Sequence, residues 1–256
     1  MPWPLMIAGA AGMVAVLAAS LIRDESLKQA RVIIAVVLFF GINFPAQKYI
    51  AKPLMADQEL QKVPAFAAIK THEPATYNAM RADIITAMQN GADANTVKAR
   101  VHTSVSAMAK KYMPRCSDKA LVRYISVTTD EIDEISKKNV EQGFDFLFPK
   151  PGAYVDVEPL LSEATRKEDL AALAEVISTG AATAKPPELD RARAGQLLRE
   201  IVQQVGVERM KMLADPNAPG ADKAEICATT ADLYRHVLEL PEGDAALVLR
   251  TMFEGL

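Results

Sequence analysis

The sequence predicts an all-α protein in which an N-terminal two-helix transmembrane hairpin, residues 1–51, is followed by an irregular multi-helix soluble domain, residues 52–256. Charge and periodicity predict this organisation. Residues 1–51 hold four basic and two acidic side chains, whereas residues 52–256 hold 25 basic and 30 acidic ones. Beyond Met55 the apolar residues recur with a helical period, and no sustained run alternates as a half-buried strand does.

The first predicted span, about residues 4–22, contains no charged side chain. Leu5–Ile22 is a run of 18 apolar or small residues, close to the roughly 20 that a helix needs to cross a bilayer. Trp3 would lie at headgroup level at the start of this span. A stripe of small side chains on one helical face would let another helix approach closely; it comprises Ala8, Gly12, Ala15 and Ala19.

The second predicted span, about residues 30–50, is built around the 13 residues Val32–Phe44. It reaches spanning length with Lys48, which can snorkel, and Tyr49, which suits a membrane interface. Asn43 either bonds to the first helix or faces headgroups and water. One alternative is a single uncleaved anchor followed by a buried segment. Another is a cleaved signal peptide, although the basic segment that begins signal peptides is missing here.

Lys and Arg residues beside the first span predict the orientation of the hairpin. None precedes the span, and three lie in the connection after it, which places this connection in the cytoplasm and both termini outside. We therefore expect an inner (cytoplasmic) membrane protein with its C-terminal domain in the periplasm or outside the cell. The flank after the second span also holds three lysines, so a cytoplasmic domain is the alternative.

The chain contains two cysteines, Cys116 and Cys227, which are 111 positions apart in the soluble domain. An even pair in an oxidising compartment is typical of a disulfide. The alternative is two unrelated thiols, with Cys227 as a small buried hydrophobic residue on a helix.

Breakers and caps delimit the first helices of the soluble domain, which is predicted to hold seven or eight helices. One helix runs from Pro74 to Asn90-Gly91, and the next runs from Val97 to Pro114. Ser117 is predicted to cap a third helix, and Thr128 with Glu131 forms a capping-box pattern inside it. The stretch is therefore either one long helix or two with a break near Val127.

Further caps and loops organise the C-terminal half. After a loop with a weak strand-like segment, Tyr154–Val157, Thr165 and Glu168 predict a helix start. The remaining signals are Pro187 in the first turn of a helix toward Leu213, Asp222 with Glu225 as a cap, and a final amphipathic helix after Pro241-Glu242-Gly243. No period of 20 to 50 residues repeats convincingly, which argues against a repeat array.

The sequence contains no G-x-S-x-G elbow, P-loop or C-x-x-C motif, so no catalytic, cofactor-binding or metal residue is predicted. Its histidines, His72, His102 and His236, lack neighbours at metal-ligand spacing. Four carboxylates are interpreted as the first turn of a helix, within pairing distance of the lysines at positions 137 and 138; they are Asp130, Glu131, Asp133 and Glu134. Seven basic residues within positions 98–123 are interpreted as a solvated helix face.

The net charge of -3 argues against nucleic-acid binding through bulk positive charge. We expect a non-enzymatic, membrane-anchored subunit or interaction protein of a bacterial-type cell-envelope complex. Its partners would be the lipid bilayer and other membrane or periplasmic proteins, or a second copy of itself, with no cofactor. The alternative is a membrane-tethered enzyme or ligand-binding domain that acts on envelope material. A deep pocket with convergent His, Asp or Glu would favour this alternative, and a shallow apolar patch would favour an interaction protein.

Overall fold

The computed structural model describes residues 58, 60–150 and 153–254, and over these residues it confirms the predicted all-α class. No helix within these ranges is long and apolar enough to cross a bilayer. The predicted hairpin lies outside the described residues, as do all of the residues assigned to it, namely Trp3, Ala8, Gly12, Ala15, Ala19, Asn43 and Tyr49.

The chain divides into two compact units. The smaller unit includes residues 79–97 and the larger one includes 63–78 and 98–254, so that helices α5 (Pro74–Gln89) and α6 (Ala94–Tyr112) have residues in both. Gly91, at φ 77°, lets the chain turn between these helices, as the Asn90-Gly91 signal predicts. Asp93 then caps α6 by accepting the backbone N–H of Thr96 at 2.9 Å.

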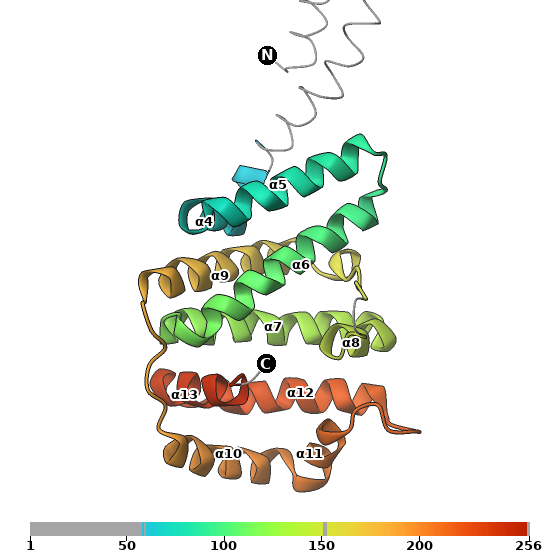
Figure 1. The fold of residues 1–256 in the computed structure, drawn as a ribbon. Helices are drawn as coiled ribbons and strands as arrows, with labels where there is room; N and C mark the ends of the chain where they lie inside the picture. Colours follow the sequence, from blue (N-terminus) through green and yellow to red (C-terminus); the bar gives the residue numbers. More distant parts are fainter. Residues whose placement is uncertain (1–57, 59, 151–152, 255–256) are drawn as a thin grey trace, which may run out of the picture. The chain divides into compact units, whose positions relative to one another are not determined.

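The larger unit is a stack of helical layers (Figure 1). Helices α4 and α9 contact each other, α9 also contacts α7, and α7 with α8 contacts α12 with α13, which in turn contact α10 and α11. The elements are α4 (Pro64–His72), η3 (Met113–Arg115), α7 (Asp118–Lys138), α8 (Val140–Leu147), η4 (Glu158–Leu160), α9 (Glu163–Ala182), α10 (Arg191–Val205), α11 (Val207–Ala214), α12 (Lys223–Leu238) and α13 (Glu242–Met252).

Helix α7 forms the centre of the stack. Ser117 caps it, as the sequence predicts, by accepting the N–H of Ala120 at 3.2 Å. Its buried aliphatic side chains, at most 2% exposed, are Leu121, Ile125, Ile132 and Ile135. Each contributes roughly 1.5–3 kcal/mol through burial. Because α7 contacts α9 in one layer and α12 and α13 in another, it organises the core of the larger unit.

Gly180 allows α9 to pass close to the end of α6 within the larger unit. A Cβ atom at this position would lie 2.8 Å from the backbone oxygen of Tyr112 and 2.9 Å from the Cβ of Tyr112. Tyr112 is only 2% exposed, and its hydroxyl donates to Glu73. A larger residue in place of Gly180 would therefore push against backbone and a buried ring.

Some predicted boundaries of the helices are wrong. Of the two alternatives for the stretch after Ser117, the structure shows the single long helix, since α7 continues through Thr128 and Glu131 and their capping-box pattern marks no helix start. Ser162 caps α9 in place of Thr165, and Tyr154–Val157 forms no strand. The loop before α9 bonds to α7 at Glu134, so tertiary contacts fix the helix start there.

The predicted helix after Pro187 also differs. Asp190 caps α10, so Pro187 lies in the linker before the helix, and Gly206, at φ 101°, separates α10 from α11. The predicted cap at Asp222 is confirmed, because it accepts the N–H of Glu225 at 3.1 Å. The final helix after Pro241 is confirmed as α13.

Candidate functional site

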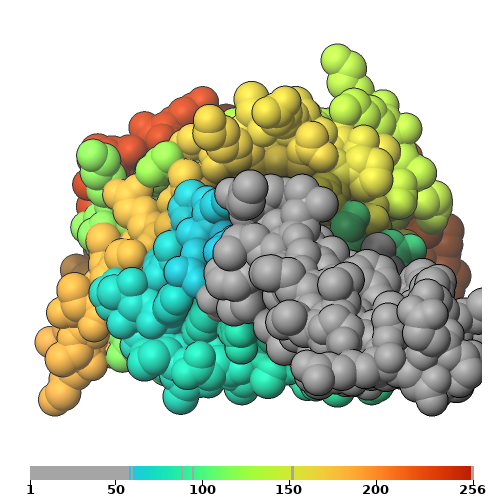
Figure 2. Space-filling view, turned by 90° about the horizontal axis from the view of Figure 1, so that it is seen from above, coloured from blue at the N-terminus to red at the C-terminus, as the bar shows by residue number. Residues whose placement is uncertain are grey.

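The segment between α9 and α10 crosses the stack of helices. Helix α9 lies on one side of α7, and α10 lies against α12 and α13 on the other, so residues 183–190 run past the intervening layers (Figure 1). We call residues 183–190 the crossover linker. Pro186 and Pro187 prevent it from continuing as a helix, because proline lacks a backbone N–H and disfavours helical geometry before it. Both prolines are exposed, and the light-orange end of α9 and linker lie at the surface in Figure 2.

A cavity of about 360 Å³ lies where the linker passes the N-terminal end of α7 and the C-terminal end of α13; we call it the crossover pocket. Its apolar walls come from η3, α7, the linker and the end of α13, and are formed by Met113, Pro114, Leu121, Pro186, Pro187, Leu189 and Phe253. Leu121 is fully buried, whereas the other six are partly or fully exposed. The pocket therefore opens to the surface with an apolar lining.

Arg250 is the buried cation of the crossover pocket. Its side chain is 7% exposed, and its Nη1 donates to Asp118 Oδ1 at 2.6 Å. Its Nη2 donates to the backbone oxygen of Cys116 at 2.7 Å, so α13 is tied to the start of α7. The Nε of Arg250 is buried without a hydrogen-bond partner among the described residues. An unsatisfied buried donor costs about 1–3 kcal/mol.

The rim of the crossover pocket holds Glu188, Arg191 and Glu254. Arg191 Nε donates to Glu254 Oε2 at 3.2 Å, and Nη2 of the same guanidinium bonds to the other carboxylate oxygen. The pKa of Glu254 is lowered by the hydrogen bond from Arg191. Both cations of the pocket are therefore already paired with carboxylates, and its lining carries no excess of positive charge.

The possible disulfide between Cys116 and Cys227 is not formed, because both thiols are free and buried. Cys116 lies just before α7, whereas Cys227 and Ser136 line one cavity near the other end of α7. The helix rises about 27 Å over the 18 steps from Asp118 to Ser136, whereas a disulfide requires Cα atoms within about 7 Å. Burial raises the pKa of Cys116 to about 11 and also raises that of Cys227. The structure matches the alternative of two unrelated thiols.

The three histidines do not converge in the structure. His72 ends α4, His102 on α6 packs against the ring of Tyr154 at 5.4 Å, and His236 on α12 lies 3.2 Å from Glu239. Burial lowers the pKa of His102. Within the described ranges, no three His, Cys, Asp or Glu side chains are placed to hold a metal ion.

The four carboxylates 130–134 lie in the middle of α7, so their interpretation as a first helical turn is wrong. Asp133 pairs with Arg235 of α12, not with the lysines that follow it in the sequence. Glu134 accepts the Ser162 N–H at 2.6 Å and the Thr165 hydroxyl, and these hydrogen bonds lower its pKa. Two of the four therefore join α7 to neighbouring elements.

Glu131 is the buried member of that group, at 7% exposure. Its pKa is raised by burial first, and then by the negative charges of Asp169, Glu134 and Asp130. Burial also raises the pKa values of Asp169 on α9, Tyr124 on α7 and Tyr234 on α12. In the described part of the chain no cation pairs with Glu131, so its surroundings favour the protonated carboxyl.

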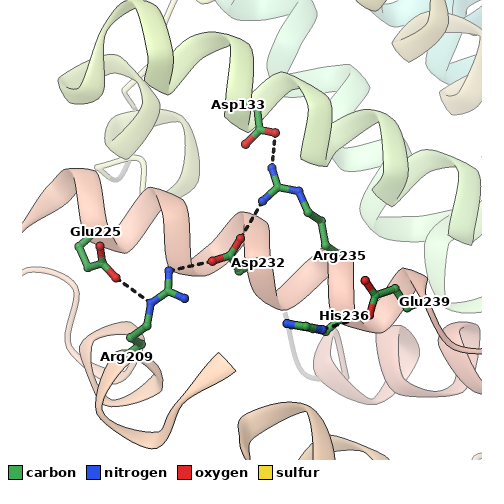
Figure 3. A network of polar contacts seen from close by, with 7 residues as sticks. All are labelled: Asp133, Arg209, Glu225, Asp232, Arg235, His236 and Glu239. Carbon is green, nitrogen blue, oxygen red and sulfur yellow. Dashed lines mark hydrogen bonds and ion pairs between the residues drawn. The ribbon is translucent and has the colours of Figure 1, made fainter. Parts of the chain in front are cut away.

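A network of ion pairs joins α11, α12 and α7 (Figure 3). Arg209 bonds to Glu225 at 2.7 Å and to Asp232 at 2.8 Å, and Arg235 links Asp232, at 2.8 Å, to Asp133. These side chains are about one third to one half exposed, so each pair contributes about 1 kcal/mol or less. The network joins three helices, and each of these five side chains is engaged in an ion pair.

Three of the seven basic residues at positions 98–123 form ion pairs. Lys98 bonds to Asp156 at 3.1 Å and to Glu158 at 2.5 Å, Lys111 bonds to Glu73, and Arg123 bonds to Glu168 and Glu175 at 2.6 and 2.7 Å. Arg100, Lys110, Lys111 and Lys119 are exposed, in keeping with the interpretation of the run as a solvated helix face.

Sequence reasoning missed the crossover pocket. Arg250 and Asp118 are 132 positions apart, and nothing in either local sequence marks them as partners. The Pro186-Pro187 pair was a usable signal, because two prolines before a capped helix indicate an extended linker, but they do not indicate what the linker covers. Comparisons with known protein families, curated proteins and solved structures found no match to this chain.

Proposed function

We propose that this protein is a non-enzymatic, membrane-anchored subunit or interaction protein of a bacterial-type cell-envelope complex, whose helical domain docks other envelope proteins. The observation that carries the proposal is the crossover pocket, which opens to the surface with six accessible apolar side chains and with both of its cations already paired. Exposed apolar surface of this kind is typical of sites that bind other molecules.

The membrane anchor in this proposal rests on the sequence of residues 1–51. Its 18-residue apolar run suits a transmembrane helix, and the Lys and Arg distribution favours a domain outside the cytoplasm. A cytoplasmic domain is the competing orientation. The two free thiols favour neither, because both are buried and shielded from the surrounding redox conditions.

A membrane-tethered enzyme or ligand-binding domain is the second candidate. The volume of the crossover pocket, about 360 Å³, favours it, because small-molecule sites begin near that size. An enzyme would need acid, base or nucleophilic groups that converge. Of the lining residues, Glu254 is bonded to Arg191 and Arg250 is bonded to Asp118, and no His lies among them. The arrangement supports binding better than catalysis.

Isolation of the intact protein from its native membranes tests the proposed function. The full chain would be purified in a mild detergent that preserves membrane complexes, and its mass and co-purifying proteins would be determined. We expect a defined complex with a stoichiometric envelope protein. Recovery as a lone monomer under these conditions would contradict the proposal.

Labelling of an introduced thiol tests the orientation. Val207 is 52% exposed, so Val207→Cys would place an accessible thiol at the start of α11, and the wild type, with two buried thiols, is the matched control. We expect a membrane-impermeant maleimide to label the variant in intact cells and to leave the wild type unlabelled. Labelling of the variant only after lysis would establish the cytoplasmic orientation.

A further inference from the structure

Hydrogen bonds at both ends of the interface between α7 and α9 define how the two helices face each other. At the start of α7, the backbone N–H of Ser117 donates to the hydroxyl of Thr179, near the end of α9, at 3.2 Å. In the second half of α7, Glu134 accepts from the hydroxyl of Thr165, near the start of α9, at 2.5 Å. The two helices are therefore antiparallel, and positions that advance along α7 meet positions that go back along α9.

This register places Glu131 of α7 opposite Asp169 of α9. Residues three or four positions apart lie on the same face of a helix, so Glu131 shares a face with Glu134, and Asp169 shares one with Thr165. Because Glu134 bonds to Thr165, the next turn inward on each antiparallel helix brings Glu131 and Asp169 to the same level. The pKa of Glu131 reports the same proximity, since Asp169 is the first of the charges that raise it.

The two facing carboxyls lack compensating partners. Glu131 is buried and Asp169 is half-buried, and neither forms a hydrogen bond or ion pair with any part of the chain that the structure describes. Burial raises the pKa of both groups above the usual values. Two carboxylates this close at a buried interface repel each other and lose hydration, so the arrangement is stable only while the pair retains a proton.

The charged groups on the surrounding elements do not relieve this repulsion. Described lysines of α7 and α9 that lack a bonded partner, namely Lys119, Lys137 and Lys167, are exposed. On α4 and η3, Lys70 and Arg115 lie over tyrosine rings, and His72 is exposed. The cations already bonded elsewhere are Arg123 with Glu168 and Glu175, Lys138 with the Leu160 oxygen, Arg166 with Glu158, Lys223 with Glu141, Arg235 with Asp133 and Asp232, His236 with Glu239, and Arg250 with Asp118.

The remaining titratable groups near Glu131 also favour its neutral form. Asp130 and Glu134 on α7 add negative charge. Burial raises the pKa of Tyr124 on α7 and of Tyr234 on α12, so both phenols stay neutral and supply no charge.

We propose that Glu131 and Asp169 form a proton-operated latch between the layer of α4 and α9 and the rest of the larger unit, closed while the pair retains a proton and loosened when both carboxyls are ionised. Among the described elements, α9 makes its main contacts with α4, α7 and η3, so weakening at α7 acts on this layer as a whole. The crossover linker after α9 is not helical, so α9 can shift without breaking a helix there. This inference is independent of the proposed docking function.

The direction of the pH response follows from the two carboxyls. Both are easier to protonate in the folded protein than at the usual values of 3.8 for Asp and 4.5 for Glu. Their contribution to the interface is therefore fully present in acid and is lost as the pH rises through the folded pKa values. The latch loosens toward alkaline pH.

Hydrogen exchange followed by mass spectrometry on the full chain in detergent tests the latch. Protection factors, which correct each amide for its intrinsic exchange rate at a given pH, would be measured at pH 5 and pH 9 for α9 and for α12, on the other side of α7. We expect protection in α9 to fall about tenfold more than in α12, equivalent to about 1.4 kcal/mol. An equal fall in both helices, or none in α9, would overturn the inference.

Substitutions identify the groups responsible. Glu131→Gln combined with Asp169→Asn keeps both shapes and removes both titrations, so the extra loss of protection in α9 should disappear. Asp133→Asn is the matched control, because it removes a carboxyl of α7 that pairs with Arg235 instead, and it should keep the wild-type difference. Persistence of the difference in the double variant, or its disappearance in the control, would refute the assignment. Should the double variant not fold, Asp169→Asn alone must reduce the difference, and a full wild-type difference in that variant would refute the latch.

Discussion

Arg250 of α13 and Glu131 of α7 are both buried, but their charges are handled in different ways. Arg250 lies beside the start of α7, where its guanidinium is paired with Asp118 and with the backbone oxygen of Cys116. The pKa of Glu131, in the middle of α7, is raised by burial and by the negative charges of Asp169, Glu134 and Asp130, so the protonated form is favoured. Burial alone therefore does not determine whether an ionisable side chain is charged. The available partner decides whether an ionisable group keeps its charge.

Loss of the partner of Arg250 should have the largest effect. Asp118→Ala would leave the buried guanidinium without its carboxylate, and we expect the free energy of unfolding to fall by about 2–3 kcal/mol, because Asp118 itself is 44% exposed. Urea denaturation followed by circular dichroism measures this. Arg191→Ala, which breaks an exposed pair at the same pocket, is the control and should leave stability unchanged. Equal losses in the two variants would mean that Arg250 is not effectively buried.

The second prediction concerns the pH dependence contributed by Glu131. Its folded pKa is raised above the usual 4.5, so the folded state holds a proton that the unfolded state has lost at higher pH. The contribution of Glu131 to the free energy of unfolding is therefore fully present below pH 4.5. It falls as the pH rises, by at most about 1.4 kcal/mol per pH unit. Glu131→Gln mimics the protonated form and should flatten the slope of unfolding free energy between pH 5 and about pH 8.

Glu134 on the same helix is the matched control, because its pKa shift has the opposite sign. Hydrogen bonds from Thr165 and Ser162 lower its pKa, so its contribution is present above pH 4.5 and is lost as pH falls. Glu134→Gln should therefore destabilise the protein at neutral pH and matter less in acid. An unchanged pH slope in Glu131→Gln would show that Glu131 is ionised in the folded state, against the comparison with Arg250.

The smallest effect is expected in the exposed ion-pair network. Arg235 is 44% exposed on its side chain, compared with 7% for Arg250. Arg235→Ala breaks bonds to Asp133 and Asp232, yet should cost only about 0.5–1 kcal/mol, because water solvates both carboxylates. Raising the salt concentration should reduce this difference between variant and wild type. A cost near that of Asp118→Ala would show that exposure does not separate the two arginines energetically.

Most helices of the described region could be predicted from the sequence, but only some of the residues at which they begin could be. Ser117 and Asp222 cap their helices through local hydrogen bonds, which local sequence determines. Thr128 with Glu131 carries the same kind of signal, but the buried apolar side chains on either side of that point hold α7 as one helix. Pro187 suits a first helical turn, yet the linker must remain extended there to cross the stack.

The candidate site was not predictable for a related reason. It depends on residues from η3, α7, the linker and α13, which meet only because the layers are stacked out of sequence order. The free thiols illustrate the same limit, because an even cysteine count says nothing about the length of helix that separates the two residues.

The order in which the layers are added has a consequence for synthesis. Helices emerge from the ribosome in sequence, and α7 and α9 can pack together long before α13 exists. Until α13 docks, Asp118 lacks its cation and the crossover linker has no Phe253 or Arg250 beneath it. A nascent chain therefore cannot present the complete crossover pocket until α13 has been translated and has docked.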